Sequence, residues 1–169
     1  MTMLATIGYE GASIADFLAT LDLAGVKQVI DIRDVPVSRR PGFSKNILAS
    51  ALHDQGVSYV HYKALGDPKP GREAARAGQF DAFRAIYEKH LTLDAGQEAL
   101  KSAVEVAKSV RSVLLCYERD SRHCHRTIVA NAMSELYAFQ IRHLGVQKVG
   151  RSTERGTPKG HGTVAIAPC

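Results

Sequence analysis

Short apolar segments alternate along the chain with segments of helical periodicity, and this alternation is the first evidence on the fold. Four runs rich in apolar and branched residues predict strands: MLATIG, KQVIDI, VSYVHY and SVLLCYE. Two of them contain nearly continuous apolar stretches, QVIDI and VLLCY, which are typical of strands covered on both faces of a parallel sheet. A short fifth strand is expected near 146–149.

The segments between these runs carry apolar residues at helical spacing. The clearest example lies between Ser13 and Gly25, where the repeat is formed by Ile14, Phe17, Leu18 and Leu21. Ser13 with Asp16 three residues later is a capping-box pattern, so a helix should begin there. Further helices are expected from Ser44 to about Gly56 and over 80–90, 97–110 and 124–139. The Pro- and Gly-containing segment 66–78 is expected to be a long polar, basic loop.

Strands that alternate with helices predict an α/β fold, a three-layer Rossmann-like domain whose mostly parallel sheet is flanked by helices. A chain of 169 residues is expected to form one domain. We assign residues 1–149 to that domain. Residues 150–169 lose the periodicity and are rich in Gly and Thr, which predicts an extended C-terminal tail.

Composition narrows the class of protein. The hydrophobic fraction of 45% and the charged fraction of 23% are those of an ordinary globular protein, which excludes a wholly disordered chain. No apolar run approaches the roughly 20 residues of a membrane span, and no secretory signal is recognisable at the N-terminus. Three cysteines without framework spacing favour a reducing cytoplasm. The net charge of +5 permits an anionic partner, either a small phosphorylated or nucleotide ligand or a nucleic acid.

Ionisable residues are concentrated after the predicted strands. Open parallel sheets bind ligands outside the carboxyl ends of their strands, so these residues are the candidate site. They are Gly8 and Tyr9 after the first strand, Asp31, Arg33, Ser38 and Arg39 after the second, and Cys116, Glu118, Cys124, His125 and Arg126 at and after the fourth.

Cys124 is the candidate nucleophile, because it is expected at or near the start of a helix. Backbone N–H groups and nearby basic residues at such a position stabilise a thiolate. His125 and Glu118 would then act as acid, base or orienting partners. A buried, unreactive cysteine and an ordinary Glu118 salt bridge are the alternatives.

Three arginines are candidates to bind a phosphate-like anion: Arg33, Arg39 and Arg126. For Arg33 the alternative is a structural pair with Asp31, and for Arg39 it is ordinary surface charge. Tyr9 could stack on a base, although an aromatic ring near a strand end is more often part of the core.

Cys116 lies inside an apolar run, so core packing is its leading interpretation. Its spacing to Arg122 matches the Cys-x5-Arg loop of cysteine phosphatases, but the loop has no glycine. Cys116, His123, Cys124 and His125 offer four metal ligands within ten residues. Adjacent His-Cys-His residues rarely all reach one ion and no CxxC spacing occurs, so no metal site is predicted.

The ordered motifs resemble the uncharacterised domain-of-unknown-function family 488 over residues 4–135. They are TIGYEGASIADFLATL, DIRDVPVSRRPGFSK, GVSYVHYKALG and CYERDSRHCHRTIVANAM. The resemblance implies a single α/β domain and supplies no reaction. It also implies that the motif residues form one site: Gly8, Asp31, Arg33, Pro36, Ser38, Arg39, Tyr59, Cys116, Glu118, Cys124, His125 and Arg126.

The leading interpretation is therefore a cytoplasmic α/β protein with an anion pocket at the carboxyl edge of the sheet, and a Cys/His-dependent enzyme acting on a phosphorylated or nucleotide substrate. One alternative is a non-catalytic nucleic-acid or nucleotide-binding module. Another is a metal or redox protein that uses Cys116 and Cys124. The sequence specifies no cofactor and no membrane partner.

Overall fold

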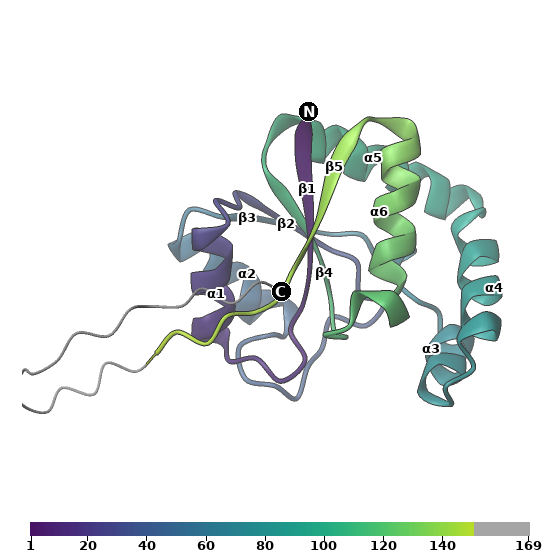
Figure 1. Ribbon diagram of the computed structural model, residues 1–169, viewed down its shortest axis with the longest axis horizontal. Helices are drawn as coiled ribbons and strands as arrows, with labels where there is room; N and C mark the ends of the chain where they lie inside the picture. The colour runs from purple at the N-terminus through teal and green to yellow at the C-terminus, as the bar shows by residue number, and fades with distance from the viewer. Residues whose placement is uncertain (151–169) are drawn as a thin grey trace, which may run out of the picture.

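The fold is built on a five-stranded sheet in the order β3-β2-β4-β1-β5. The computed structural model describes residues 1–150 (Figure 1). The strands are β1 (Thr2–Gly8), β2 (Gln28–Asp31), β3 (Ser58–His61), β4 (Ser112–Cys116) and β5 (Phe139–Leu144). Every strand pair within these residues is parallel, which confirms the α/β class and the expected sheet.

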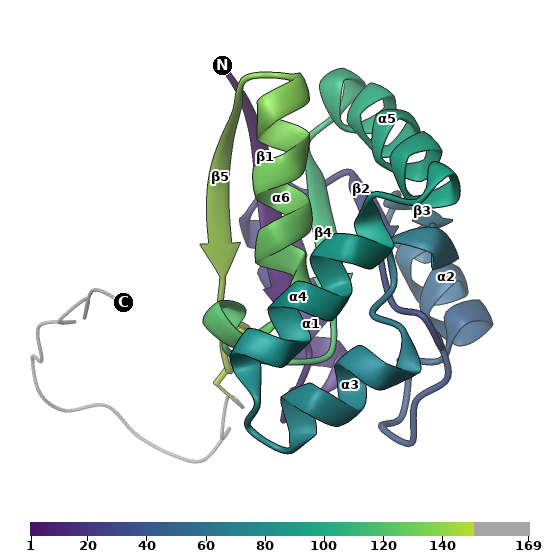
Figure 2. The ribbon, with the colours of Figure 1, turned by 90° about the vertical axis from the view of Figure 1, so that its right-hand side faces the viewer.

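Helices cover both faces of the sheet and complete three layers (Figures 1 and 2). One face carries α1 (Ile14–Leu23) and α2 (Lys45–Asp54), whereas the other carries α3 (Lys69–Arg76), α4 (Phe80–Leu91), α5 (Asp94–Ser109) and α6 (His125–Leu136). Two short 3-10 turns, η1 (Lys63–Leu65) and η2 (Ser121–His123), precede α3 and α6.

Two hydrophobic cores separate the layers. Val29 and Leu115 pack with Phe17 of α1 on one side. Their sequence neighbours Ile30 and Leu114 pack in the other core, against the second helical layer. Because both faces of these central strands are buried, their sequences are continuously apolar rather than alternating.

The predicted start of α1 is confirmed in detail, since Ser13 Oγ accepts a hydrogen bond of 3.1 Å from the Asp16 N–H. Ser44 occupies the corresponding position before α2 but makes no such bond. Its Oγ instead donates to the Ser38 carbonyl and accepts from the Ser38 N–H, at 3.2 and 3.1 Å. These bonds close the turn that follows β2.

Two local predictions were wrong. The segment expected to be a loop contains α3, because Pro70 lies in the first helical turn, where a missing N–H costs nothing. At the C-terminal end, α6 stops at Leu136 and the last strand runs over Phe139–Leu144 rather than 146–149. Thr2–Ile7 pairs with this strand along its whole length. This pairing at the edge of the sheet, rather than the helical spacing of apolar residues, decides where α6 ends.

No helix within residues 1–150 is long and apolar enough to cross a membrane. The expected C-terminal tail falls on 151–169, which lie outside the described residues.

Candidate functional site

The carboxyl ends of β1, β2 and β4 meet the start of α6 at one edge of the sheet. Gly8 lies beside Cys116 in the strand register, and Asp31 lies beside Leu115. A side chain on Gly8 would collide with the carbonyl of Glu118, so glycine is required for β1 to approach the chain after β4. The strand ends that carry the predicted site residues therefore lie together in the structure.

The two cysteines form the innermost part of this edge. Cys124 is the N-cap residue of α6, as expected, and only 3% of it is exposed. Its Sγ accepts a hydrogen bond from the Arg126 N–H at 3.5 Å and lies within bonding distance of Cys116 Sγ. Cys116 is fully buried and also lies 3.2 Å from Oε2 of Glu118. Cys116 thus belongs both to the core and to the polar cluster.

The orientation of His125 is set by the backbone of the chain after β2. Its Nε2 lies 2.7 Å from the Ile32 carbonyl oxygen, which can only accept, so Nε2 carries the proton. The unprotonated Nδ1 faces Cys124 Sγ at 3.8 Å. Burial lowers the pKa of His125 to about 4, so the ring is neutral at pH 7.

Arg126, expected to bind an anion, is almost fully buried and is occupied by groups of the protein itself. Its guanidinium donates to Cys116 Sγ and Thr6 Oγ1, both at 3.2 Å. It also donates to the carbonyl groups of Glu118 and of Arg119. These hydrogen bonds hold the segment after β4 against the sulfur atoms of Cys116 and Cys124.

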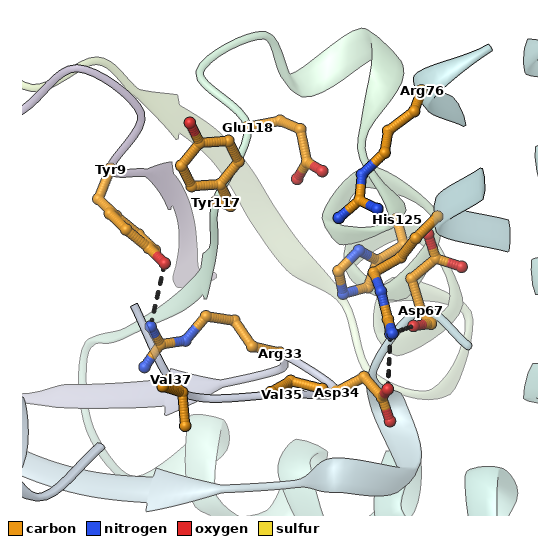
Figure 3. A pocket seen from close by; sticks show the side chains of 11 residues that line it. Tyr9, Arg33, Asp34, Val35, Val37, Asp67, Arg76, Tyr117, Glu118 and His125 are labelled. Atoms are coloured by element: carbon orange, nitrogen blue, oxygen red, sulfur yellow. Dashed lines mark hydrogen bonds and ion pairs between the residues drawn. The ribbon is translucent and has the colours of Figure 1, made fainter. Parts of the chain in front are cut away.

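Arg33 is similarly occupied, by the Asp31 carboxylate, by the Tyr9 hydroxyl and by the Phe43 carbonyl. Burial opposes its charge, but the hydrogen bonds and charge of Asp31 outweigh this effect and raise the pKa of Arg33. The Arg33 side chain still borders the pocket, with the ring of Tyr9 held beside it (Figure 3).

A cavity of about 360 Å³ opens in front of this cluster (Figure 3). Tyr9 and Tyr117 line one side of it, and their rings meet edge to face at 5.3 Å. Glu118 and Arg76 point into it, with His125 at its inner wall. Cys116 and Cys124 do not line this cavity, so Glu118 and His125 separate their sulfur atoms from it.

Two carboxyl groups that line the cavity have a pKa above its ordinary value. Burial, reinforced by the charge of Glu118, raises the pKa of Asp67 to about 7. Burial also raises the pKa of Glu118. Asp67 Oδ1 is buried with no hydrogen-bond partner within the described chain. With a pKa near 7, Asp67 can exchange protons with a bound molecule near neutral pH.

A second, more open cavity of about 610 Å³ adjoins the first and shares Tyr9, Val37, Arg76 and Tyr117 with it. Its remaining wall is the turn after β2, formed by Ser38, Arg39, Arg40 and Pro41. Arg40 donates to the Ala12 carbonyl at 2.7 Å. Within residues 1–150 no hydrogen bond or ion pair engages the guanidinium groups of Arg39 and Arg76, which are therefore available to an anion.

The sequence analysis placed Asp34 after the second strand and Arg76 in a basic loop without giving either a role, and it did not select Asp67 or Tyr117. Asp67 and Arg76 belong to segment 66–78, which the sequence predicts to be a loop. Their charged groups line the cavity because α3 forms in this segment. Asp34 holds this segment in place through Arg72, whose Nη1 lies 2.5 Å from Asp34 Oδ2. Tyr117 directly follows β4, so the strand-end rule could have found it.

The fold and the site define a Rossmann-like α/β protein with a polar pocket and a buried Cys/His cluster at the carboxyl edge of its sheet. The chain belongs to the family described as Domain of unknown function DUF488, whose model matches residues 13–133. No curated protein and no solved structure matches the chain.

Proposed function

We propose that the protein is an enzyme that binds a small phosphorylated or nucleotide-type molecule at this edge, with Cys124, His125 and Glu118 as the reaction centre. The observation that carries the proposal is the junction of the two cavities. Arg39 lines the open cavity and Arg76 lines both cavities, whereas the proton-exchanging groups, with the thiols behind them, line the first. A substrate lying across the junction would place its anionic end in the open cavity and its reacting group near Glu118.

Arg39 and Arg76 supply the anion recognition. Hydrogen bonds from guanidinium groups to phosphate oxygens are charge-assisted and about twice as strong as neutral ones. Tyr117, which is 47% exposed, flanks the passage between the cavities and offers aromatic surface to a planar ring, whereas the Tyr9 ring is buried and stacked on Phe43. Stacking on such rings contributes about 1–3 kcal/mol per base in nucleic-acid complexes. A nucleotide, with one planar and one anionic part, therefore suits both features.

Glu118 and His125 supply the proton chemistry. The raised pKa of Glu118 allows this carboxyl group to carry a proton at higher pH than usual and to release it on demand. The neutral His125 ring presents Nδ1 as an acceptor for the Cys124 thiol proton. Cys116 and Cys124 would stay reduced only in a reducing compartment, so the cytoplasm is the proposed location.

Binding is tested by calorimetric titration with inorganic phosphate, a nucleoside monophosphate and a short oligonucleotide. Loss of one charge-assisted bond costs about 1.5–3 kcal/mol, so Arg76→Ala should weaken nucleotide binding roughly tenfold or more. Arg84→Ala removes an exposed arginine that lines neither cavity and should leave affinity unchanged. Equal affinities of both variants would contradict the proposed site.

Turnover of bound compounds is followed by phosphorus NMR and chromatography. We expect Cys124→Ser and Glu118→Gln to bind the nucleotide but not convert it. Normal function of Cys124→Ser would support the non-catalytic binding module instead. A steep salt dependence with preference for the oligonucleotide would identify nucleic acid as the ligand, since each neutralised phosphate adds to the slope.

A further inference from the structure

Four potential metal ligands converge behind the pocket. They are Sγ of Cys116, Sγ of Cys124, Nδ1 of His125 and a carboxylate oxygen of Glu118, and all lie within 4.8 Å of one another. Cys116 ends β4, Glu118 follows it, and the other two residues begin α6. The sequence also offered His123 as a possible metal ligand. In the structure its ring instead stacks on Phe80, with ring centroids 4.1 Å apart.

The separation of the two cysteines favours a shared ligand over a direct covalent bond. Their Cα atoms are 7.6 Å apart, wider than the range of about 4.4–6.8 Å that a disulfide usually spans. Their side chains nevertheless point at the same place from two different elements. Thiols that converge in this way can bind one ion without moving the backbone, after small side-chain rotations that part the sulfur atoms.

His125 has the orientation of a metal-binding histidine. Such residues usually donate the other ring N–H to a carbonyl or carboxylate, which fixes the tautomer and directs the free nitrogen to the ion. Here Nε2 donates to the Ile32 carbonyl at 2.7 Å, and Nδ1 faces the thiols.

Arg126 donates only a single hydrogen bond to each of the two cysteine sulfur atoms, so both sulfur atoms keep lone pairs for an ion. The Arg126 guanidinium donates to Cys116 Sγ at 3.2 Å. The Arg126 backbone N–H donates to Cys124 Sγ at the N-terminus of a twelve-residue helix. Binding would release the thiol protons to solvent as the metal–sulfur bonds form.

We propose that Cys116, Cys124 and His125 bind a zinc-class divalent cation, with Glu118 completing the coordination from the side of the pocket. Two thiolates and an imidazole select zinc over the hard cations, which prefer oxygen ligands. Ligand atoms of a tetrahedral zinc ion lie roughly 3.3–3.8 Å apart, given bonds of about 2.0–2.3 Å. The His125–Cys124 separation of 3.8 Å and the Glu118–Cys116 separation of 3.2 Å are close to this spacing.

A metal site here goes beyond the proposed function. Its presence can be measured without any substrate. Bound at this position, the ion would make Cys124 a ligand and would lie behind Glu118 and His125, which line the cavity. A zinc ion there would polarise a carbonyl, phosphoryl group or water that displaced Glu118 from it, since Glu118 is the ligand on the side of the pocket.

The test is the metal content of the full chain, purified without chelator or a polyhistidine tag, followed by cobalt(II) titration of the reduced, metal-free protein. We expect a zinc ion for each chain and a thiolate-to-cobalt charge-transfer band in the near ultraviolet. Absence of that band from the reduced wild-type protein would overturn the proposal. So would a metal-free protein in which mass spectrometry finds Cys116 joined to Cys124, which would favour the redox interpretation.

Variants locate the site. Cys116→Ser and Cys124→Ser should lose zinc and the cobalt band, whereas Cys169→Ser, which also removes a thiol, should retain both. Loss of the band in Cys169→Ser, or its retention in both of the other variants, contradicts the assignment. If a serine variant fails to fold, the wild-type cobalt spectrum still decides whether thiolates coordinate. Arg76→Ala should keep its zinc, so failure of the nucleotide-binding proposal is distinguishable from failure of this one.

Discussion

The Asp31 carboxylate holds the Arg33 guanidinium in a buried two-point ion pair, with 2.7 Å between Oδ2 and Nη2 and 2.9 Å between Oδ1 and Nε. The Tyr59 hydroxyl donates to the same carboxylate at 2.5 Å. The remaining guanidinium nitrogen donates to the Tyr9 hydroxyl and the Phe43 carbonyl. One ion pair thus orients a wall of the pocket.

Breaking this pair should be costly. Asp31→Asn leaves the Arg33 charge buried without a counter-ion, which typically destabilises a protein by about 3–5 kcal/mol. Urea denaturation measures the change in the free energy of unfolding. Glu105→Gln removes half of the exposed pair with Lys108 and should cost about 1 kcal/mol or less. Similar losses for the two variants would show that the buried pair is not a structural anchor.

The layers of the fold were predictable because local pattern and tertiary environment agree. The apolar runs around Val29 and Leu114 are strands covered on both faces, and the Ser13 cap begins a helix as expected. The pattern fails where tertiary contacts decide. The clearest case is residues 139–144, which continue a helical pattern in the sequence but pair with β1 as β5. Pro70 and Gly71 also suggest a loop, yet both lie in α3, where Gly71 packs against the Asp67 carboxyl group just before the helix.

The site was partly predictable for the same reason. Parallel strands bring their ends to one edge, so Gly8, Asp31 and Cys116 had to lie close together. Which arginines remain unoccupied could not be read from the sequence. Arg33 and Arg126 resemble anion ligands in the chain, but their partners are a carboxylate, a thiol and backbone carbonyls contributed by distant segments.

Gly8 should be intolerant of any side chain. A Cβ there would collide with the Glu118 carbonyl and lie 2.7 Å from Nη1 of Arg126. Overpacking of a buried position typically costs about 1–3 kcal/mol, and here the displaced group is backbone, so Gly8→Ala should lie at the upper end. Gly145→Ala, with no heavy atom within 4 Å, should be nearly neutral. Thermal and urea unfolding of both variants would show whether the close approach matters.

Asp67 should make stability depend on pH. Its pKa rises from 3.8 in the unfolded chain to about 7 in the folded protein, chiefly through burial. Between these values the folded state binds more protons than the unfolded state, so this contribution is full below pH 4 and is lost as the pH rises through 7. The shift corresponds to roughly 4 kcal/mol.

The measurement is the difference in unfolding free energy between Asp67→Asn and wild type, determined by urea denaturation in chelator at several pH values. The variant cannot ionise, so it should gain stability relative to wild type by a few kcal/mol between about pH 4 and pH 8. A carbon-13 NMR titration of the Asp67 carboxyl group provides an independent reading. A pH-independent difference would mean that Asp67 is not held protonated by burial.

Arg126 should not be replaceable by lysine. Its planar guanidinium reaches Thr6 Oγ1, Cys116 Sγ and two backbone carbonyls at once, which a single ammonium group cannot do. Each acceptor left buried without a donor costs about 1–3 kcal/mol, so Arg126→Lys should lose about 2–4 kcal/mol of unfolding free energy in urea. Arg122→Lys alters only the exposed pair with Asp120 and should be nearly neutral. If both lysine variants unfold alike, Arg126 acts through its charge alone, and the segment after β4 is held over the thiols by other contacts.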